Sequence, residues 1–277
     1  MIMIEKIDTE KKAMMTKKDN LPSTIDLEGM AGQGNEFVTA RDTKLPIIKL
    51  LYASSPVLND RDPRFDETAA LGDIWSETSG RVWKGRTGFF AAPCLFINTF
   101  NEWKDKGEST GRPVKIHTDP AVMSETKRDM DGKDRLPNGN YIEDTGNHFI
   151  YILDENYNVV EQALLTMKST QKKKSKMWNS MIGSRRVKGK NGFYNPPSFS
   201  QVYKISTTKE SKGDYTWSGW VVEFVDIMSP DKHLKTLEAT QGFYKSAMTS
   251  DIFGKVDFSS ETQAQGNNQA SKEAVPF

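Results

Sequence analysis

The sequence predicts a mainly β protein of the α+β class, an antiparallel meander or barrel with a few helices and a disordered C-terminal tail. Three observations support this prediction. Short apolar runs separated by Gly, Asn and Asp recur through the middle of the chain, as in sheets of short strands joined by turns. These runs lie too close together for the crossover helices of parallel β-α-β units. From about residue 257 the chain becomes polar and low in complexity.

The 277 residues leave room for one large domain or two small ones. We expect a flexible N-terminal segment over 1–36, a folded domain over 37–256 and a disordered tail over 257–277. A polar excursion around 104–147 interrupts the domain, and loops of this length are usually functional or mobile. Its RDMDGKDRLPNGN segment lacks the glycine spacing of an EF-hand, so no metal site is expected there.

Apolar runs and turn residues place the strands. After a first apolar run at 45–52, strands are expected over 74–76, 81–84, 88–100, 148–154, 159–167, 199–208 and 215–225. Side chains of the last strand alternate between two faces. One face carries Trp220, Val222 and Phe224 and belongs to the core. The other carries Tyr215, Trp217 and Val221 and exposes rings, although burial of Trp217 in a sandwich is an equal alternative.

Two helices are expected. The first runs from a cap at Ser169 or Thr170 to a terminal glycine at Gly183. Its apolar arc holds Met177, Trp178, Met181 and Ile182, and its opposite arc holds Lys172, Lys173 and Lys176. The second helix begins at Ser229-Pro230, a good capping pair. It turns an apolar side toward the body, namely Leu234, Leu237, Tyr244 and Met248.

Positive charge is concentrated in one stretch. Residues 162–209 contain eleven Lys or Arg and no Asp or Glu. The whole chain has 38 basic and 37 acidic residues, so the remainder, with 27 basic and 37 acidic residues, has a net charge of −10. Aromatic residues are interleaved with these cations. Cations that follow phosphates and rings that stack on bases are typical of proteins that bind single-stranded nucleic acid.

The candidate DNA contacts are the cations of this stretch and three of its rings. The cations are Lys168, Lys172, Lys173, Lys174, Lys176, Arg185, Arg186, Lys188 and Lys190. The rings are Tyr194, Tyr203 and Trp217. Residues 187–197 (VKGKNGFYNPP) are interpreted as a glycine-rich basic loop. The alternative for the lysines is a solvated helix face, and Trp178 is more often a core residue than a base-stacking one.

No catalytic constellation emerges from the sequence. The three histidines, His117, His148 and His233, are scattered, and no phosphate-binding or nucleophile motif occurs. The single cysteine, Cys94, lies in an apolar run and is expected to be buried. We expect no metal, no cofactor and no enzymatic activity. No apolar run approaches the roughly 20 residues of a membrane-spanning helix, so no membrane association is expected.

Several stretches resemble one family when taken in order. These are LPIIKLLYASSP, LGDIWSETSG, an apolar strand ending in FNEW, KSTQKKKSKMWNSMI, and a strand pair ending in YTWSGWVVE. They resemble bacteriophage replication and recombination proteins that bind single-stranded DNA. The resemblance covers roughly residues 37–225 and implies an OB-like barrel. The N-terminus has charges where a signal peptide has its apolar region, so we expect a cytoplasmic protein, which for a phage protein means the cytoplasm of the host cell.

The C-terminal tripeptide is a second resemblance. Val275-Pro276-Phe277 is similar to the Ile-Pro-Phe tip with which bacterial single-stranded-DNA-binding proteins recruit replication and repair partners. That family has a run of Asp before the tip, whereas this chain has Lys272 and Glu273. The resemblance implies that phage replication or recombination proteins bind the tip.

Three functions follow from these observations. The first is sequence-tolerant binding of single-stranded DNA in phage replication or recombination. The second is a phage structural or assembly protein whose basic patch contacts DNA or an acidic partner. The third is a nuclease with dispersed carboxylates. The sequence leaves open whether the protein forms a homo-oligomer.

Overall fold

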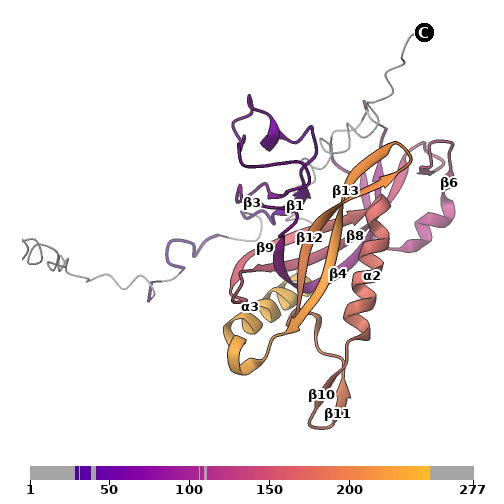
Figure 1. Ribbon diagram of the computed structural model, residues 1–277. Coiled ribbons are helices and arrows are strands. Elements are labelled where there is room, and N and C mark those ends of the chain that lie inside the picture. Colours follow the sequence, from indigo (N-terminus) through magenta and orange to yellow (C-terminus); the bar gives the residue numbers. More distant parts are fainter. Residues whose placement is uncertain (1–28, 31, 39–41, 106, 109–110, 250–277) are drawn as a thin grey trace, which may run out of the picture. The chain divides into compact units, whose positions relative to one another are not determined.

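Eleven strands of the computed structural model form one curled sheet, a half-barrel, which confirms the mainly β class (Figure 1). Its main path runs β13-β12-β4-β8-β9-β1-β2-β3. In chain order these strands are β1 (Ile47–Leu50), β2 (Ile74–Ser76), β3 (Val82–Trp83), β4 (Phe89–Trp103), β8 (Tyr141–Leu153), β9 (Val159–Lys168), β12 (Gln201–Lys212) and β13 (Tyr215–Ile227). A separate two-stranded hairpin consists of β10 (Val187–Gly189) and β11 (Gly192–Tyr194).

The structure describes residues 29–30, 32–38, 42–105, 107–108 and 111–249. The chain divides into two units, 1–42 and 43–277. The described part of the first unit consists mainly of turns, such as the one in which Gln33 N–H donates to the carbonyl of Met30. Most of the expected N-terminal segment lies outside the described residues. So does the whole of the expected tail with Val275, Pro276 and Phe277.

Neighbouring strands are antiparallel along the main path with one exception. The ladder between β4 and β8 extends from the pair Phe90–Leu153 to the pair Trp103–Tyr141. By contrast β1 pairs with β9 in parallel, with Ile47 beside Leu164. Parallel neighbours need a long connection, and here the chain from β2 to β8 provides it. The sequence prediction of a purely antiparallel sheet is therefore wrong at β1, because local spacing carries no information about a partner so distant in the chain.

The sheet curls until β12 meets the loops that flank β2 and β3. The Thr207 N–H donates to the carbonyl of Gly85 at 2.8 Å, and the Thr207 hydroxyl donates to the carbonyl of Gly72 at 2.7 Å. Gly88 approaches the same strand with φ +63°, and a Cβ added there would overlap the carbonyl of Ile205. Close backbone packing thus joins the two arms of the curl.

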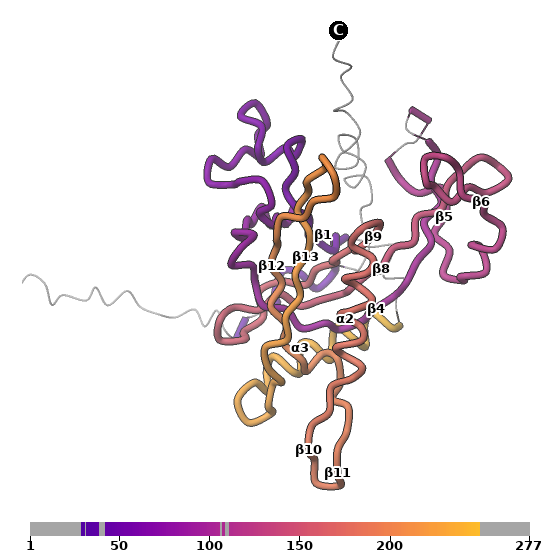
Figure 2. The backbone as a smooth tube through the Cα atoms, turned by 45° about the vertical axis from the view of Figure 1, so that its right-hand side comes forward, coloured from indigo at the N-terminus to yellow at the C-terminus, as the bar shows by residue number. Residues whose placement is uncertain are grey.

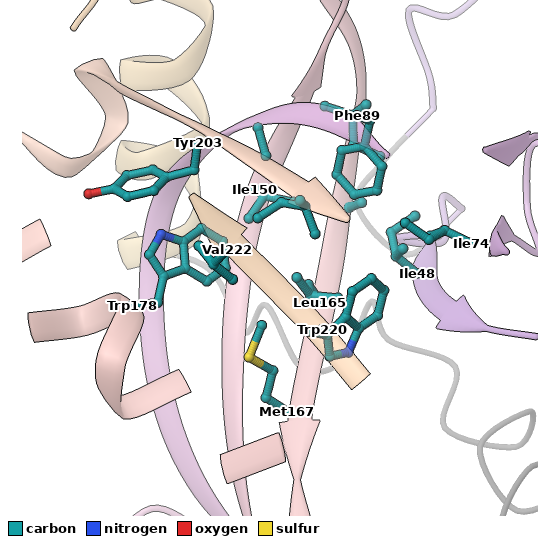
Figure 3. Packing of buried hydrophobic residues seen from close by; sticks show 14 of the residues in the cluster. Ile48, Ile74, Phe89, Ile150, Leu165, Met167, Trp178, Tyr203, Trp220 and Val222 are labelled. Atoms are coloured by element: carbon teal, nitrogen blue, oxygen red, sulfur yellow. The ribbon is translucent and has the colours of Figure 1, made fainter. Parts of the chain in front are cut away.

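The largest core cluster fills the inside of the curl, and α2 (Lys172–Ser184) packs over it (Figure 3). Trp178 of α2 is 0% exposed. Its ring stacks on His148 at 4.3 Å between centroids and meets Tyr203 edge-on at 5.6 Å. The expectation that Trp178 belongs to the core is confirmed. The expected cap at Ser169 or Thr170 is absent, because these residues form a 3-10 turn, Ser169–Gln171, and Gln171 occupies the cap position.

A second cluster lies on the other face of the sheet, beneath α3 (Pro230–Thr249). Cys94 is buried in this cluster, as expected. The buried side of α3 consists of Thr236, Thr240, Phe243 and Ala247. Leu234 and Met248 are exposed, so their expected packing is wrong. The helix is non-helical at His233, which changes the rotation of its first turn relative to an ideal helix.

The excursion between β4 and β8 is shorter than predicted, since β8 begins at Tyr141 rather than near residue 148. Its described part contains β5 (Lys115–His117), β6 (Lys127–Arg128), β7 (Asp134–Arg135) and the 3-10 helix Pro120–Glu125. The buried Glu102 carboxylate of β4 holds it in place. This carboxylate accepts hydrogen bonds from Asn138 at 3.0 Å and Asn140 at 2.6 Å, and lies 2.9 Å from His117 Nε2.

The contact at Gly88 generates a stability prediction. Gly88→Ala should lower the free energy of unfolding by about 3 kcal/mol or more, because the new methyl group adds overpacking to backbone strain. Gly80→Ala is the matched control, since Gly80 has φ +68° but nothing within 4 Å of its added Cβ. It should cost only the strain, about 1–2 kcal/mol. Urea unfolding measures both, and equal losses would contradict the close packing at Gly88.

The buried imidazole under α2 generates a pH prediction. Burial, with a smaller contribution from the charge of Lys172, lowers the pKa of His148 from 6.5 to about 3. The unfolded chain therefore binds a proton below pH 6.5 that the folded chain refuses until near pH 3, so stability falls as the pH drops through this window. Between pH 6.5 and 5 the loss should be about 2 kcal/mol.

His148→Gln is the test, because glutamine does not titrate and can still bond to Ser175. Its free energy of unfolding should change less over the same pH range than that of the unsubstituted protein. Urea denaturation at several pH values measures both curves. Parallel curves would show that His148 does not cause the loss.

Candidate nucleic-acid interface

The basic helix α2 is fastened to the sheet on both flanks by ion pairs. On one flank Lys172 Nζ lies 2.5 Å from the Asp144 carboxylate of β8. On the other, Lys174 Nζ lies 2.6 Å from the Glu210 carboxylate of β12 and donates to the carbonyl of Trp220 at 3.0 Å. Just before the helix, Lys168 lies 3.1 Å from Glu143. These lysines hold the helix in its place over the core.

Three lysines of the predicted phosphate-binding set take part in this arrangement. Lys168, Lys172 and Lys174 point into internal ion pairs rather than toward the open surface. The prediction that Lys172 lies on the exposed arc is wrong. The acidic partners of Lys172 and Lys174 come from strands 28 to 36 positions away in the chain, where helical spacing alone could not reveal them.

The exposed face of α2 presents two of the predicted cations. Lys173 and Lys176 are both exposed, and the described residues provide no ion-pair partner for either ammonium group. Met177 is also on this face, 49% exposed, so its expected place in the core is wrong. The helix is rotated so that Ser175 and Trp178 form its buried side. Ser175 fits there because it faces Gly146, whose lack of a side chain lets the helix approach β8.

Beyond α2 the chain forms the β10–β11 hairpin, which projects past the end of the helix in both views (Figures 1 and 2). The sequence interpretation as a loop is wrong here, because Val187 pairs with Tyr194 and Lys188 with Phe193. Arg186, Lys188, Lys190, Phe193 and Tyr194 are all exposed. Phe193 is 76% exposed, and the sequence-based set of candidate rings does not include it.

One side chain fixes the base of this hairpin to the helix. The Asn195 amide donates to the carbonyls of Ile182 and Gly183 at 3.0 Å and to that of Arg185 at 2.8 Å. Carbonyls at a helix C-terminus have no partner within the helix, so Asn195 satisfies groups that otherwise need water. The sequence alone does not predict that Asn195 positions the hairpin. The one available signal is its place directly before Pro196-Pro197, where a strand must end.

The three predicted rings differ in accessibility. Tyr194 is 51% exposed, and its ring lies over Gly189, where an added Cβ would come within 3.1 Å of it. Trp217 is half-buried, and its indole N–H donates to Glu210 at 2.8 Å. Tyr203 is 0% exposed, so the expected accessible ring at Tyr203 is wrong. The Tyr203 hydroxyl donates to Gln201, and burial raises the pKa of Tyr203 to about 12.

Arg185 also turns inward. Its guanidinium lies 3.5 Å from the centroid of the Phe224 ring, in a cation–π contact. Glu210, which joins Trp217 to Lys174, remains ionised, because the hydrogen bond from Lys174 lowers the pKa of this carboxyl. The accessible surface is thus an exposed ridge on α2 followed by the projecting hairpin. We call it the α2–hairpin surface, and it carries Lys173, Lys176, Arg186, Lys188, Lys190, Phe193 and Tyr194.

The described part of the chain also shows whether metal sites, membrane-spanning helices or histidine clusters occur among its residues. It contains no group of three His, Cys, Asp or Glu side chains able to hold a metal ion. None of its helices combines the length and the apolar character needed to cross a membrane. The three histidines remain separate from one another: His148 contacts Ser175, His117 contacts Glu102, and the His233 ring lies 5.3 Å from that of Tyr157.

Comparison with known proteins finds no match among curated proteins and none among solved structures. A family of bacteriophage proteins does match. The family described as Pam3 phage gp34-like protein aligns with residues 11–252, which include every described strand and helix of the barrel and the whole α2–hairpin surface. The chain therefore belongs to the Pam3 phage gp34-like protein family and is a phage protein.

Proposed function

We propose that this phage protein binds single-stranded DNA with little sequence preference, in phage DNA replication or recombination, and that it acts as a binding protein rather than an enzyme. The observation that supports the proposal is the α2–hairpin surface. It combines exposed cations, without acidic partners among the described residues, with exposed aromatic rings on an adjoining hairpin. Host cytoplasm is the location that goes with this function.

The rings favour a single strand over a duplex as the ligand. Base faces are open to stacking in a single strand, whereas stacking within a duplex covers them. Every base has a π face, so contacts of this kind tolerate any sequence and contribute about 1–3 kcal/mol per base. Of the rings that the sequence predicts, Tyr194 and the half-buried Trp217 remain candidates, and Phe193 joins them.

The alternative, that the lysines of α2 form only a solvated helix face, accounts less well for the hairpin. Isolated two-stranded hairpins are marginally stable in water, and this one leaves Phe193 and Tyr194 exposed. The fold leaves the exposed part of these rings and the adjacent cations uncovered. A polyanion with flat, partly apolar bases is the ligand that uses both.

The proposal includes the OB-like character that the resemblance implies. The curled, mostly antiparallel sheet sealed by a helix supports it. An OB-fold barrel has five strands, whereas the main path of this sheet has eight. The proposed likeness to an OB-fold is therefore limited to the curl of the sheet and a binding surface on its outside. It does not extend to the strand order.

A second candidate is a phage structural or assembly protein that uses the same cations for packaged DNA or an acidic partner. The burial of Tyr203 favours it, because one predicted stacking ring is missing from the surface while five exposed cations remain. Recruitment of replication or recombination proteins by Val275-Pro276-Phe277 stays a prediction. Those residues lie outside the described part of the chain.

The proposed function predicts quenching of tryptophan fluorescence by poly-dT. Trp217→Phe should abolish most of the quench but leave the affinity nearly unchanged, because phenylalanine keeps a π face. The measurement is a fluorescence titration with poly-dT and with duplex DNA at two salt concentrations. Equal affinity for duplex without any quench would instead support the structural or assembly protein.

The division of the lysines into two sets predicts a difference in salt dependence. Changing Lys173, Lys176, Lys188 and Lys190 to Gln should weaken poly-dT binding. It should also reduce the slope of log K against log salt by about 0.7 for each phosphate that the variant no longer neutralises. The matched control changes Lys172 and Lys174 to Gln, which breaks the ion pairs with Asp144 and Glu210. The control should lower the urea midpoint and leave the slope unchanged. Equal slopes for both variants would remove the role assigned to the exposed lysines.

A further inference from the structure

The two rings of the β10–β11 hairpin lie on opposite faces of a two-stranded ribbon. Phe193 and Tyr194 are consecutive residues of β11, and consecutive side chains of a strand point to opposite faces. Tyr194 lies on the face of Val187 and Gly189, while Phe193 lies opposite Lys188 on the other. A platform that stacks a row of bases needs its rings on one face. A ring on each face suits insertion between two stacked bases.

The direction of the ribbon is fixed at its base. Asn195 donates to three carbonyls at the end of α2, and the Gln201 amide donates to the carbonyl of Pro196 at 3.0 Å. The ribbon consequently continues beyond the helix (Figure 2). A single strand of DNA that follows Lys173 and Lys176 along α2 would reach the two rings of the hairpin at the end of the helix.

The charge on the ribbon argues against the same ribbon of a second copy as the occupant of the hairpin. Arg186, Lys188 and Lys190 are exposed on it, and the hairpin itself contains no Asp or Glu. Two such ribbons would repel each other. A polyanion neutralises them, and the groups that the rings can cover in a polyanion of this kind are bases.

We propose that the β10–β11 hairpin is a wedge for the end of a duplex, so that the preferred ligand is DNA in which a single strand adjoins base pairs. One ring covers the terminal base pair, and the other stacks on the first unpaired base. Insertion of apolar side chains between base steps is a known way for proteins to unstack DNA. This inference rests on the proposed function and specifies its ligand.

The test uses the full chain and three labelled DNA ligands at one salt concentration. They are single-stranded oligo-dT, a self-folding duplex that carries the same oligo-dT as a tail, and the same duplex with a blunt end. We expect the tailed duplex to bind at least about ten times more tightly than oligo-dT alone, from the stacking of one additional ring. A 2-aminopurine placed in the terminal base pair should change its fluorescence when a ring replaces the first unpaired base as its stacking partner.

Substitutions connect this preference to the rings. Phe193→Ala and Tyr194→Ala should each weaken binding of the tailed duplex by about 5- to 150-fold and bring it toward that of oligo-dT. Phe193→Tyr and Tyr194→Phe keep the rings and should keep the preference. Phe65→Ala removes an exposed ring outside the α2–hairpin surface and should change nothing. Unchanged urea midpoints establish that each variant is folded.

The remaining outcomes separate this inference from the proposed function. Equal affinity for oligo-dT and the tailed duplex would overturn the wedge and leave single-strand binding in place. Equal losses on both ligands in the alanine variants would also overturn it, since the rings would then be a general stacking surface. Tightest binding to the blunt duplex would overturn it in favour of a ribbon in the major groove. Failure to bind oligo-dT or the tailed duplex would refute the proposed function itself.

Discussion

The packing of Trp178 against the inside of the curled sheet is the interaction on which the rest of the structure depends. The half-barrel would otherwise leave its core cluster open where α2 now lies. Trp178 stacks on His148 from β8 and meets Tyr203 from β12, so a single side chain joins the helix to the strands on either side of β4. Lys172 and Lys174 then fix the rotation of the helix from either flank. That rotation decides which lysines reach the solvent.

Sequence patterns predict the elements that depend on local spacing. The strand pair β12–β13, the place of α2 and the burial of Trp178 all follow from alternation or helical arcs. The same patterns could not separate Lys172 from Lys173. What separates them is a carboxylate on β8, and an arc drawn on one helix contains nothing about its neighbours. Local sequence patterns do not show which charged residues, distant in the chain, lie next to a helix in the fold.

Two other differences have physical causes of the same kind. A basic stretch surrounds Tyr203 in the chain and favours an accessible ring, yet Tyr203 alternates with Ile205 on the core face of β12. Val202, on the opposite face, is buried as well, so alternation gives no warning. The β10–β11 hairpin resembles a loop in the sequence because Gly189, Gly192 and two prolines dominate it. Its base is held from outside the hairpin by Asn195, which donates to carbonyls at the end of α2.

The cost of placing lysines at the start of α2 bears on what the surface is for. Cations in the first turn of a helix oppose its dipole by about 0.3–1 kcal/mol each. For Lys172 and Lys174 the neighbouring carboxylates offset this cost. Lys173 is exposed, and the described structure offers it no such partner. Removing its charge would therefore make the isolated helix more stable, not less. Lys173 lies on the same ridge as Lys176, which leads to the exposed rings, and the proposed polyanionic ligand would supply the negative charge that the described structure does not.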